Sequence, residues 1–229
     1  MTEAQDPAGW RQRWVEGRTG FHQDEVNGHL EEHWPSQVAS KTARVLVPLC
    51  GKSSDMLWLR RRGHDVVGVE LSELACRAFF ADNGLAFDVA EKGSHLIFSA
   101  LGDGPKLQLI CGDFFTLDAR TVGLVEAWYD RAALVALPPA QWPEYAAALA
   151  RFLPPGASAL MLTFEYPQSE REGPPYSVSF EDVEREFSGQ FSTSLLDRVS
   201  RTEGNRWEFS EVFEPVISLV RSEPASRCR

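Results

Sequence analysis

The chain has 229 residues, which is long enough for one well-buried core and short for two independent ones. Its 43% hydrophobic and 24% charged residues exclude a largely disordered or fibrous protein. The formal net charge of -10 argues against nucleic acid as a partner, because affinity for a phosphate backbone rests on Lys and Arg. We therefore expect a single domain over residues 1–229.

The cysteines and the N-terminus point to a reducing compartment. Cys50, Cys76, Cys111 and Cys228 form no CxxC pair, and no histidine at the spacing of a zinc site is identified, so we expect neither a metal nor a disulfide framework. The first twenty residues are polar and lack the apolar stretch of a signal peptide or membrane span. A cytoplasmic protein that does not associate with membranes is expected.

Two short helices, over residues 10–17 and 27–34, are expected to pack on a sheet that follows them. The first strand is the apolar run over residues 44–47. A tight turn over residues 48–51 then leads into a helix, and Gly63 ends that helix as a left-handed residue. This part of the chain predicts a strand followed by a helix.

The same order of elements is repeated. Residues 65–70 predict a second strand, and Ser72 is a suitable N-cap for a helix that runs to about Asn83. Residues 107–111 and 125–129 predict the third and fourth strands. Strands that alternate with helices indicate a parallel sheet with helices on both faces.

The last third of the chain changes character. A helix over residues 142–153 and a strand over residues 157–164 are followed by a helix over residues 180–187. Two extended segments, 191–199 and 207–220, then predict an antiparallel hairpin. This ending favours a mainly parallel α/β sheet with an antiparallel C-terminal hairpin over a wholly parallel dinucleotide fold.

The turn after the first strand resembles a phosphate loop only at one end. Gly51-Lys52-Ser53 matches the end of GxxxxGK[ST], but Leu46 occupies the place of the first glycine. Pro48 also removes a backbone N–H that a phosphate cradle needs. The motif therefore argues against a nucleotide triphosphatase, although the turn still places a helix N-terminus at the end of a strand, where α/β sheets bind ligands.

One acidic residue ends the second strand, and another comes just after the third. Glu70 lies about twenty positions after the glycine turn and is placed to accept hydrogen bonds from both ribose hydroxyls of an adenosine. Asp113 precedes Phe114, a pair that suits an adenine amino group and its ring face. The alternatives are a solvated carboxylate for Glu70 and ordinary turn chemistry for Asp113. A nicotinamide enzyme would need GxGxxG, whereas this turn has only Gly51.

Several segments, in order along nearly the whole chain, resemble the bacterial type of the thiopurine S-methyltransferase family. PLCGKS together with GVELSE is the most specific part of the match. The matching segments are WRQRW (10–14), GFH (20–22) with Val26-Asn27, VLVPLCGKS (45–53), GHDVVGVELSE (63–73), YDRAALVALP (129–138), GPPY (173–176) and residues 207–220.

The resemblance implies a seven-stranded, Rossmann-like class I fold and transfer of a methyl group from S-adenosylmethionine to the thiol of a small aromatic or heterocyclic acceptor. It also implies that Phe21 borders the acceptor. The cofactor residues so expected, together with Gly51 of the turn, are Trp14, Leu49, Glu70, Asp113, Phe114 and Arg131. No metal is expected to take part.

Arg131 is the residue expected to act in catalysis, because its guanidinium stays protonated and can bind a sulfur-bearing anion. The alternative is an ion pair with Asp130, its chain neighbour. Asp130 and His22 are candidate proton acceptors if the acceptor binds as a neutral thiol. Whether Arg201 or Arg206 supplies a second guanidinium to the acceptor is left open.

The aromatic residues ahead of the sheet suggest that residues 1–34 form a helical lid that excludes water from the cofactor. No apolar stripe stands out on the surface, so a monomer is expected. Two alternatives remain open. The first is the same fold acting on selenium or tellurium species, halide or thiocyanate, and the second is a protein that binds S-adenosylmethionine without catalysis.

Overall fold

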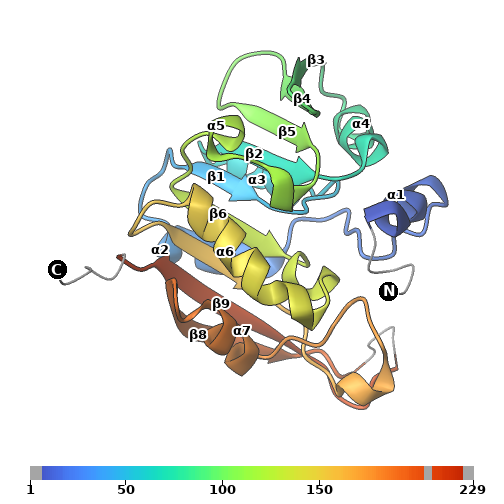
Figure 1. Ribbon diagram of the computed structural model, residues 1–229, viewed down its shortest axis with the longest axis vertical. Helices are drawn as coiled ribbons and strands as arrows, with labels where there is room; N and C mark the ends of the chain where they lie inside the picture. The colour runs from blue at the N-terminus through green and yellow to red at the C-terminus, as the bar shows by residue number, and fades with distance from the viewer. Residues whose placement is uncertain (1–6, 204–207, 224–229) are drawn as a thin grey trace. The chain divides into compact units, whose positions relative to one another are not determined.

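The computed structural model describes residues 7–203 and 208–223 (Figure 1). The chain forms two compact units, Met1–Tyr129 and Asp130–Arg229. The division falls inside one strand, β6 (Ala127–Arg131). Among the described residues, no helix combines the length and the hydropathy needed to cross a membrane.

The first unit contains a sheet with the strand order β3-β4-β5-β2-β1-β6. Its parallel strands are β1 (Arg44–Val47), β2 (Asp65–Glu70), β5 (Leu107–Cys111) and the start of β6. The chain leaves β1 toward β2 on one side and returns beside it as β6 on the other. Such a reversal places the carboxyl ends of neighbouring strands around an open crevice, where α/β proteins bind ligands.

A hairpin extends this sheet beyond the strands expected from the sequence. β3 (Phe87–Lys92) and β4 (His95–Ala100) pair antiparallel, and β4 also pairs antiparallel with β5. β3 was not expected because the strand is mostly exposed and lacks a buried apolar face. The strands of the described residues number nine, two more than the seven expected, and this hairpin is the difference.

The helices of the first unit confirm the main start and stop signals. Ser72 caps α4, since its hydroxyl accepts a hydrogen bond from the Ala75 N–H (3.3 Å), and Gly63 takes the expected left-handed conformation with φ 104°. The two N-terminal helices occur, each shifted by a few residues. The helices are α1 (Pro7–Val15), α2 (Gly28–Gln37), α3 (Asp55–Arg61), α4 (Glu73–Asp82), η2 (Phe114–Thr116) and α5 (Ala119–Val122).

Buried polar contacts hold α2 in place. The Trp34 indole N–H donates to His64 Nε2 (3.1 Å), while His64 Nδ1 lies 3.2 Å from the Ala43 carbonyl. Burial lowers the pKa of His64, so the ring is neutral, donating through Nδ1 and accepting through Nε2. Trp34 also meets Tyr129 edge to face at 6.2 Å. These contacts fix the orientation of α2, which buries the side chains of Leu30 and Trp34 in the first unit.

The second unit combines helices with the predicted C-terminal hairpin. Its strands β7 (Ser158–Leu162), β9 (Phe213–Arg221) and β8 (Phe191–Ser200) pair antiparallel in that order. The last strand begins at Phe213, later than expected, and Trp207 lies outside the described residues. The helices are η3 (Leu134–Ala136), η4 (Pro139–Gln141), α6 (Trp142–Phe152), η5 (Gln168–Glu170) and α7 (Phe180–Phe187).

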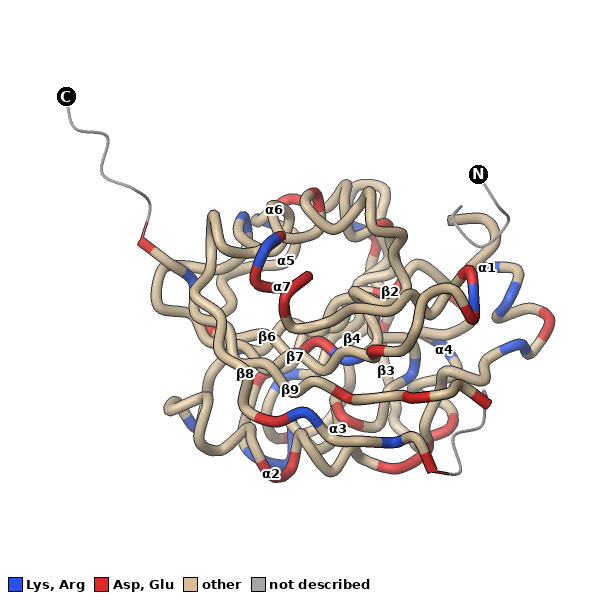
Figure 2. Tube along the Cα trace, turned by 90° about the horizontal axis from the view of Figure 1, so that it is seen from below, with Lys and Arg blue, Asp and Glu red and all other residues tan. Residues whose placement is uncertain are grey.

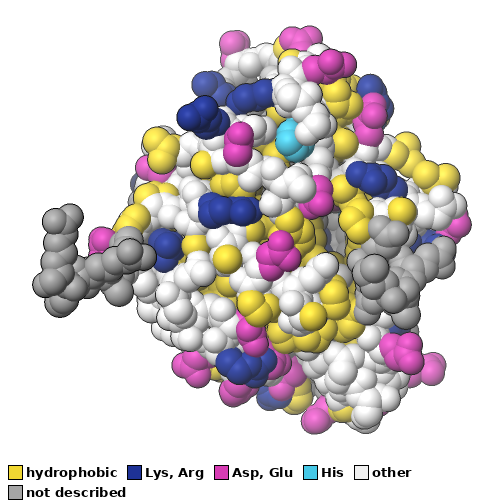
Figure 3. Space-filling view, viewed as in Figure 1, with side chains coloured by type: hydrophobic (Ala, Val, Ile, Leu, Met, Phe, Trp, Pro, Cys, Tyr) yellow, Lys and Arg dark blue, Asp and Glu magenta, His cyan; other side chains and the backbone are white. Residues whose placement is uncertain are grey.

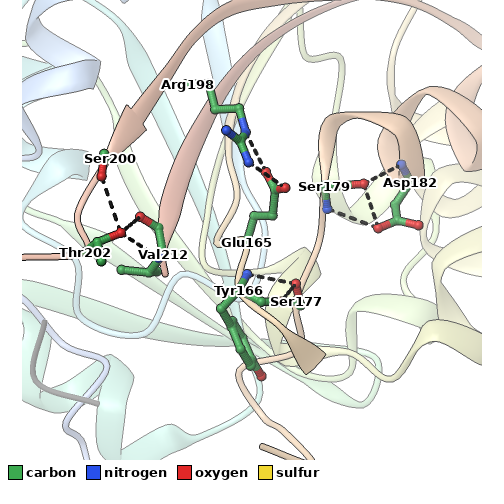
Figure 4. Close-up of polar contacts among 9 residues, drawn as sticks. All are labelled: Glu165, Tyr166, Ser177, Ser179, Asp182, Arg198, Ser200, Thr202 and Val212. Atoms are coloured by element: carbon green, nitrogen blue, oxygen red, sulfur yellow. Dashed lines mark hydrogen bonds and ion pairs between the residues drawn. The ribbon is translucent and has the colours of Figure 1, made fainter. Parts of the chain in front are cut away.

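Side-chain hydrogen bonds organise the loops of this unit (Figure 4). Ser179 and Asp182 form a capping box at the start of α7, which satisfies backbone donors at both residues. Arg198 donates to both carboxylate oxygens of Glu165, at 2.9 Å each. Its guanidinium also lies 3.5 Å from the centre of the Phe213 ring. The contacts fix the loop after β7 to the hairpin.

Candidate functional site

The turn after β1 contains two left-handed residues. Leu49 has φ 47° and Gly51 has φ 53°, while the Cys50 N–H between them donates to the Val69 carbonyl of β2 (2.9 Å). A leucine in this conformation costs roughly 1–3 kcal/mol, a strain that proteins tolerate mainly at functional sites. The turn is therefore held in a specific shape beside the end of β2.

Glu70 joins this turn to the start of α4. Its Oε2 accepts from the Gly51 N–H (2.9 Å) and its Oε1 from the Ser72 N–H (2.7 Å), and the residue is only 7% exposed. Burial raises the pKa of Glu70, and the backbone hydrogen bonds oppose that rise. Each carboxylate oxygen keeps a second acceptor position, so Glu70 can also accept hydroxyl groups from a ligand.

The end of β5 lies beside the end of β2. The Gly112 N–H donates to the Glu70 carbonyl (2.9 Å), and Asp113 Oδ1 accepts from the Phe115 N–H (3.0 Å) as the N-cap of η2. Phe114 is 3% exposed, whereas Phe115 is half-buried. Asp113 thus directly follows the residue that bonds to the Glu70 carbonyl, one of its carboxylate oxygens accepts from the backbone of its own turn, and the Phe114 ring is buried.

Two glycines of this region were not identified from the sequence. A Cβ on Gly68 would lie 2.7 Å from Cys50 Sγ and 2.9 Å from Met56 Sδ, so only glycine lets the turn pack on β2. A Cβ on Gly112 would lie 2.2 Å from His95 Cδ2. A glycine inside a predicted strand is a recognisable signal of close approach, and Gly68 carries it.

Aromatic residues from the N-terminal segment lie over the turn. A Cβ on Gly51 would be 3.2 Å from Trp14 Cζ2, which places the indole against the glycine. Phe21 meets the rings of Trp14 and Trp10 edge to face, at 5.6 and 5.7 Å. Arg11 Nε donates to the Leu71 carbonyl (3.4 Å), beside Glu70. The structure therefore brings Trp14, Gly51 and Glu70 together, with Phe21 behind Trp14.

Two other candidate residues of the first unit have clear surroundings. His22 Nε2 lies 3.2 Å from Asp24 Oδ1, and the His22 side chain is 14% exposed. Cys50 is buried, and burial raises the pKa of its thiol well above the usual value. A protonated buried thiol suits a packing residue and not a nucleophile.

In the second unit, Arg131 is the last residue of β6 and is half-buried. Asp130 is fully buried: Tyr145 OH donates to its Oδ2 (2.6 Å) and the Ala133 N–H to its Oδ1 (3.3 Å). Burial raises the pKa of Asp130 to about 6. Arg201 donates to Glu214 (2.9 Å), and Arg206 lies outside the described residues.

Sequence comparisons identify a family. Residues 5–222 match the family described as thiopurine S-methyltransferase. A thiopurine S-methyltransferase of Methylococcus capsulatus is 44% identical over 200 residues, 87% of this chain and 89% of the relative. One from Xanthomonas campestris pv. campestris is 47% identical over 190 residues, 82% and 84% of the two chains.

Comparisons with solved structures support the fold. A magnesium protoporphyrin IX methyltransferase from Synechocystis matches with a TM-score of 0.62 at 15% identity, covering 95% of this chain and 98% of the other. The N-methyltransferase NodS from Bradyrhizobium japonicum matches with 0.61 at 12% identity, covering 93% and 97%. The expected class I, Rossmann-like fold is confirmed.

Proposed function

Because the chain belongs to the thiopurine S-methyltransferase family, we propose that it methylates the thiol of a small aromatic or heterocyclic acceptor. It is an S-adenosylmethionine-dependent methyltransferase, and its cofactor supplies an electrophilic methyl group on a sulfonium. The observation that carries the proposal is the position of Glu70, a buried carboxylate bonded to the turn after β1 and to the start of α4.

The residues around Glu70 suit the two ends of the cofactor. Glu70 would accept the ribose hydroxyls, and Asp113 with its neighbour Phe114 would border the adenine. The turn with Leu49 and Gly51 would hold the methionine part against its strained backbone. Trp14, which covers Gly51, would exclude water from the sulfonium.

Arg131 is proposed to bind the acceptor in its ionised form and also to contact the cofactor, while Phe21 would border the acceptor. A thiolate is a good nucleophile without further activation, so a guanidinium that favours the anion replaces a general base. Asp130 accepts two hydrogen bonds inside the second unit, which favours a structural role for it over proton transfer. His22 remains the candidate for a neutral thiol.

The direct test is transfer from labelled S-adenosylmethionine to 6-mercaptopurine, with selenite-derived species, iodide and thiocyanate as parallel acceptors. We expect transfer to the thiol and a loss of about a hundredfold or more in Arg131→Ala. Arg185→Ala, which removes an exposed arginine of α7, is the matched control and should retain activity. Transfer to none of the acceptors would favour a protein that only binds S-adenosylmethionine.

Charge and surface support the remaining parts of the proposal. On the face in Figure 3, Lys and Arg side chains lie among acidic and hydrophobic ones. Together with the net charge of -10, this favours a small-molecule acceptor over nucleic acid. We propose a monomer located in the cytoplasm and not bound to membranes.

A further inference from the structure

Three side chains of α2 lie on one face of that helix. His29, Glu32 and His33 are separated by three and four residues, a spacing that brings side chains together on a helix. Each offers a nitrogen or oxygen atom that can bind a metal, and these atoms all lie within 4.8 Å of one another. The two imidazole rings stack at 30°, with 6.1 Å between their centres. Figure 2 marks acidic residues on α2.

The polar atoms of this cluster are not all satisfied. His33 Nε2 is buried and has no hydrogen-bond partner, and it lies 3.8 Å from Glu32 Oε2. A buried nitrogen without a partner is unfavourable, so a native structure that retains one calls for a physical reason. His29 is 8% exposed, while the Glu32 side chain is 69% exposed. The cluster is therefore open to solvent on the carboxylate side.

The ligand atoms must move closer together to hold an ion. Zinc binds imidazole nitrogen and carboxylate oxygen at about 2.0–2.2 Å, so two ligand atoms of a tetrahedral site lie roughly 3.3–3.6 Å apart. The atoms of this cluster lie within 4.8 Å of one another, and rotation of the His and Glu side chains must supply the remaining approach of about 1.3 Å. A set of two imidazoles and one carboxylate suits zinc and its first-row neighbours, and is unsuited to calcium or magnesium.

We propose that His29, Glu32 and His33 form a binding site for a divalent first-row transition metal ion such as zinc. The ion would join the first two turns of α2 and leave coordination positions for water. The helix is already anchored by Asn27, whose side chain accepts from the His29 N–H (2.9 Å) and whose N–H donates to Asp55 (2.8 Å). A bound ion would thus stabilise α2 and act outside the cofactor cradle.

None of the three ligands is a cysteine, so the cysteine pattern does not indicate this cluster. His29 and His33 have the H-x3-H spacing of a metal site, and the expectation that no histidine has such a spacing is wrong. The third ligand, Glu32, is found only when the residues are placed on a helix.

The test is calorimetric titration of ZnCl2 into the full chain, produced without a histidine tag and stripped with EDTA. We expect saturable binding of one ion and a rise in the melting temperature. Loss of a residue that only hydrogen-bonds to a metal ligand weakens metal binding by roughly tenfold or more. Loss of a ligand itself should cost more, so we expect His33→Asn to weaken zinc binding by more than about tenfold. The double variant His29→Asn/His33→Asn should abolish binding. Far-UV circular dichroism establishes that each variant is folded.

Two matched controls separate the site from adventitious binding. Glu32→Gln should weaken zinc binding severalfold, whereas Glu31→Gln, its neighbour on the same helix, should leave it unchanged. His95→Asn removes a histidine of β4 and should also leave it unchanged. Absence of saturable binding in the wild type would overturn the proposal. The proposal would also be overturned if His33→Asn and Glu32→Gln fold and bind zinc as tightly as Glu31→Gln and His95→Asn.

Discussion

Glu70 occupies two backbone donors at once, and its charge matters for both. In Glu70→Gln, one amide oxygen replaces two carboxylate oxygens, and the amide NH2 group faces a backbone N–H. Hydrogen bonds to charged groups contribute about 1.5–3 kcal/mol. We therefore expect Glu70→Gln to weaken S-adenosylhomocysteine binding by roughly ten- to a hundredfold, as measured by calorimetry.

Glu73→Gln is the control for this change, because Glu73 lies three residues away and pairs with Arg77 on the surface of α4. That variant should bind S-adenosylhomocysteine like the wild type. If Glu70→Gln also does, Glu70 does not hold the sugar.

Asp130 predicts a pH dependence of stability. Its folded pKa of about 6 lies above the usual aspartate value of 3.8, so the native state favours the neutral form. The contribution of Asp130 to the free energy of unfolding is then largest below about pH 4 and is lost as the pH rises through about 6. At neutral pH Asp130 is ionised, and the folded protein is then less stable than it is with a neutral Asp130.

Asp130→Asn keeps an acceptor for the Ala133 N–H and a polar group beside Tyr145 while removing the charge. We expect the variant to be more stable than the wild type at pH 7.5, by at most about 3 kcal/mol, with a difference that shrinks toward pH 4. Urea unfolding of both proteins across this range measures it. A difference that is independent of pH would show that the carboxyl does not titrate as expected.

For single residues, the sequence predicts which chemical group lies at a strand end better than it predicts what that group contacts. Glu70, Gly51 and Asp113 could be placed because each lies at or just after the end of a strand, and parallel strands end at the same edge of a sheet. That Glu70 is buried, that Asp113 caps its own helical turn and that Asp130 meets Tyr145 depend on packing between distant segments. No local pattern encodes such contacts.

At the scale of elements, α1 and the loop after it cover the glycine turn. Trp14 contacts Gly51, and Arg11 reaches the Leu71 carbonyl, yet both contacts involve only side chains of a short helix. We propose that residues 7–28 act as a lid, and we expect their backbone amides to exchange several times more slowly once S-adenosylhomocysteine is bound. Hydrogen exchange followed by mass spectrometry measures this.

Peptides of α7 serve as the internal reference for that experiment and should show the same exchange with and without ligand over labelling times that are short compared with global unfolding. If residues 7–28 exchange equally fast with and without S-adenosylhomocysteine, the proposal of a lid is wrong.

Elements with a buried apolar core were predictable, and elements without one were not. β1, β2, β5 and α7 have the expected bounds because their hydrophobic runs end at clear turn or capping residues. β3 lacked such a run: five of its six residues are exposed, so its place is decided by pairing with β4. Edge strands of this kind are specified by their partners.

For the whole molecule, we propose that the two compact units unfold together as one domain, since the division between them falls within β6. One thermal transition is expected. S-adenosylhomocysteine at a hundred times its dissociation constant should add about 2.7 kcal/mol and raise the melting temperature by roughly 5–10 °C. Differential scanning calorimetry measures both. Two transitions, of which the ligand moves only one, would contradict a single domain.

The bridge that Glu70 makes between Gly51 and Ser72 has an evolutionary consequence. One side chain sets the geometry of two successive loops, so a change in either loop alters the other as well. Selection for binding of the methyl donor must therefore preserve Gly51, Glu70 and Ser72 together. Diversification toward new acceptors is left to residues that do not share this carboxylate.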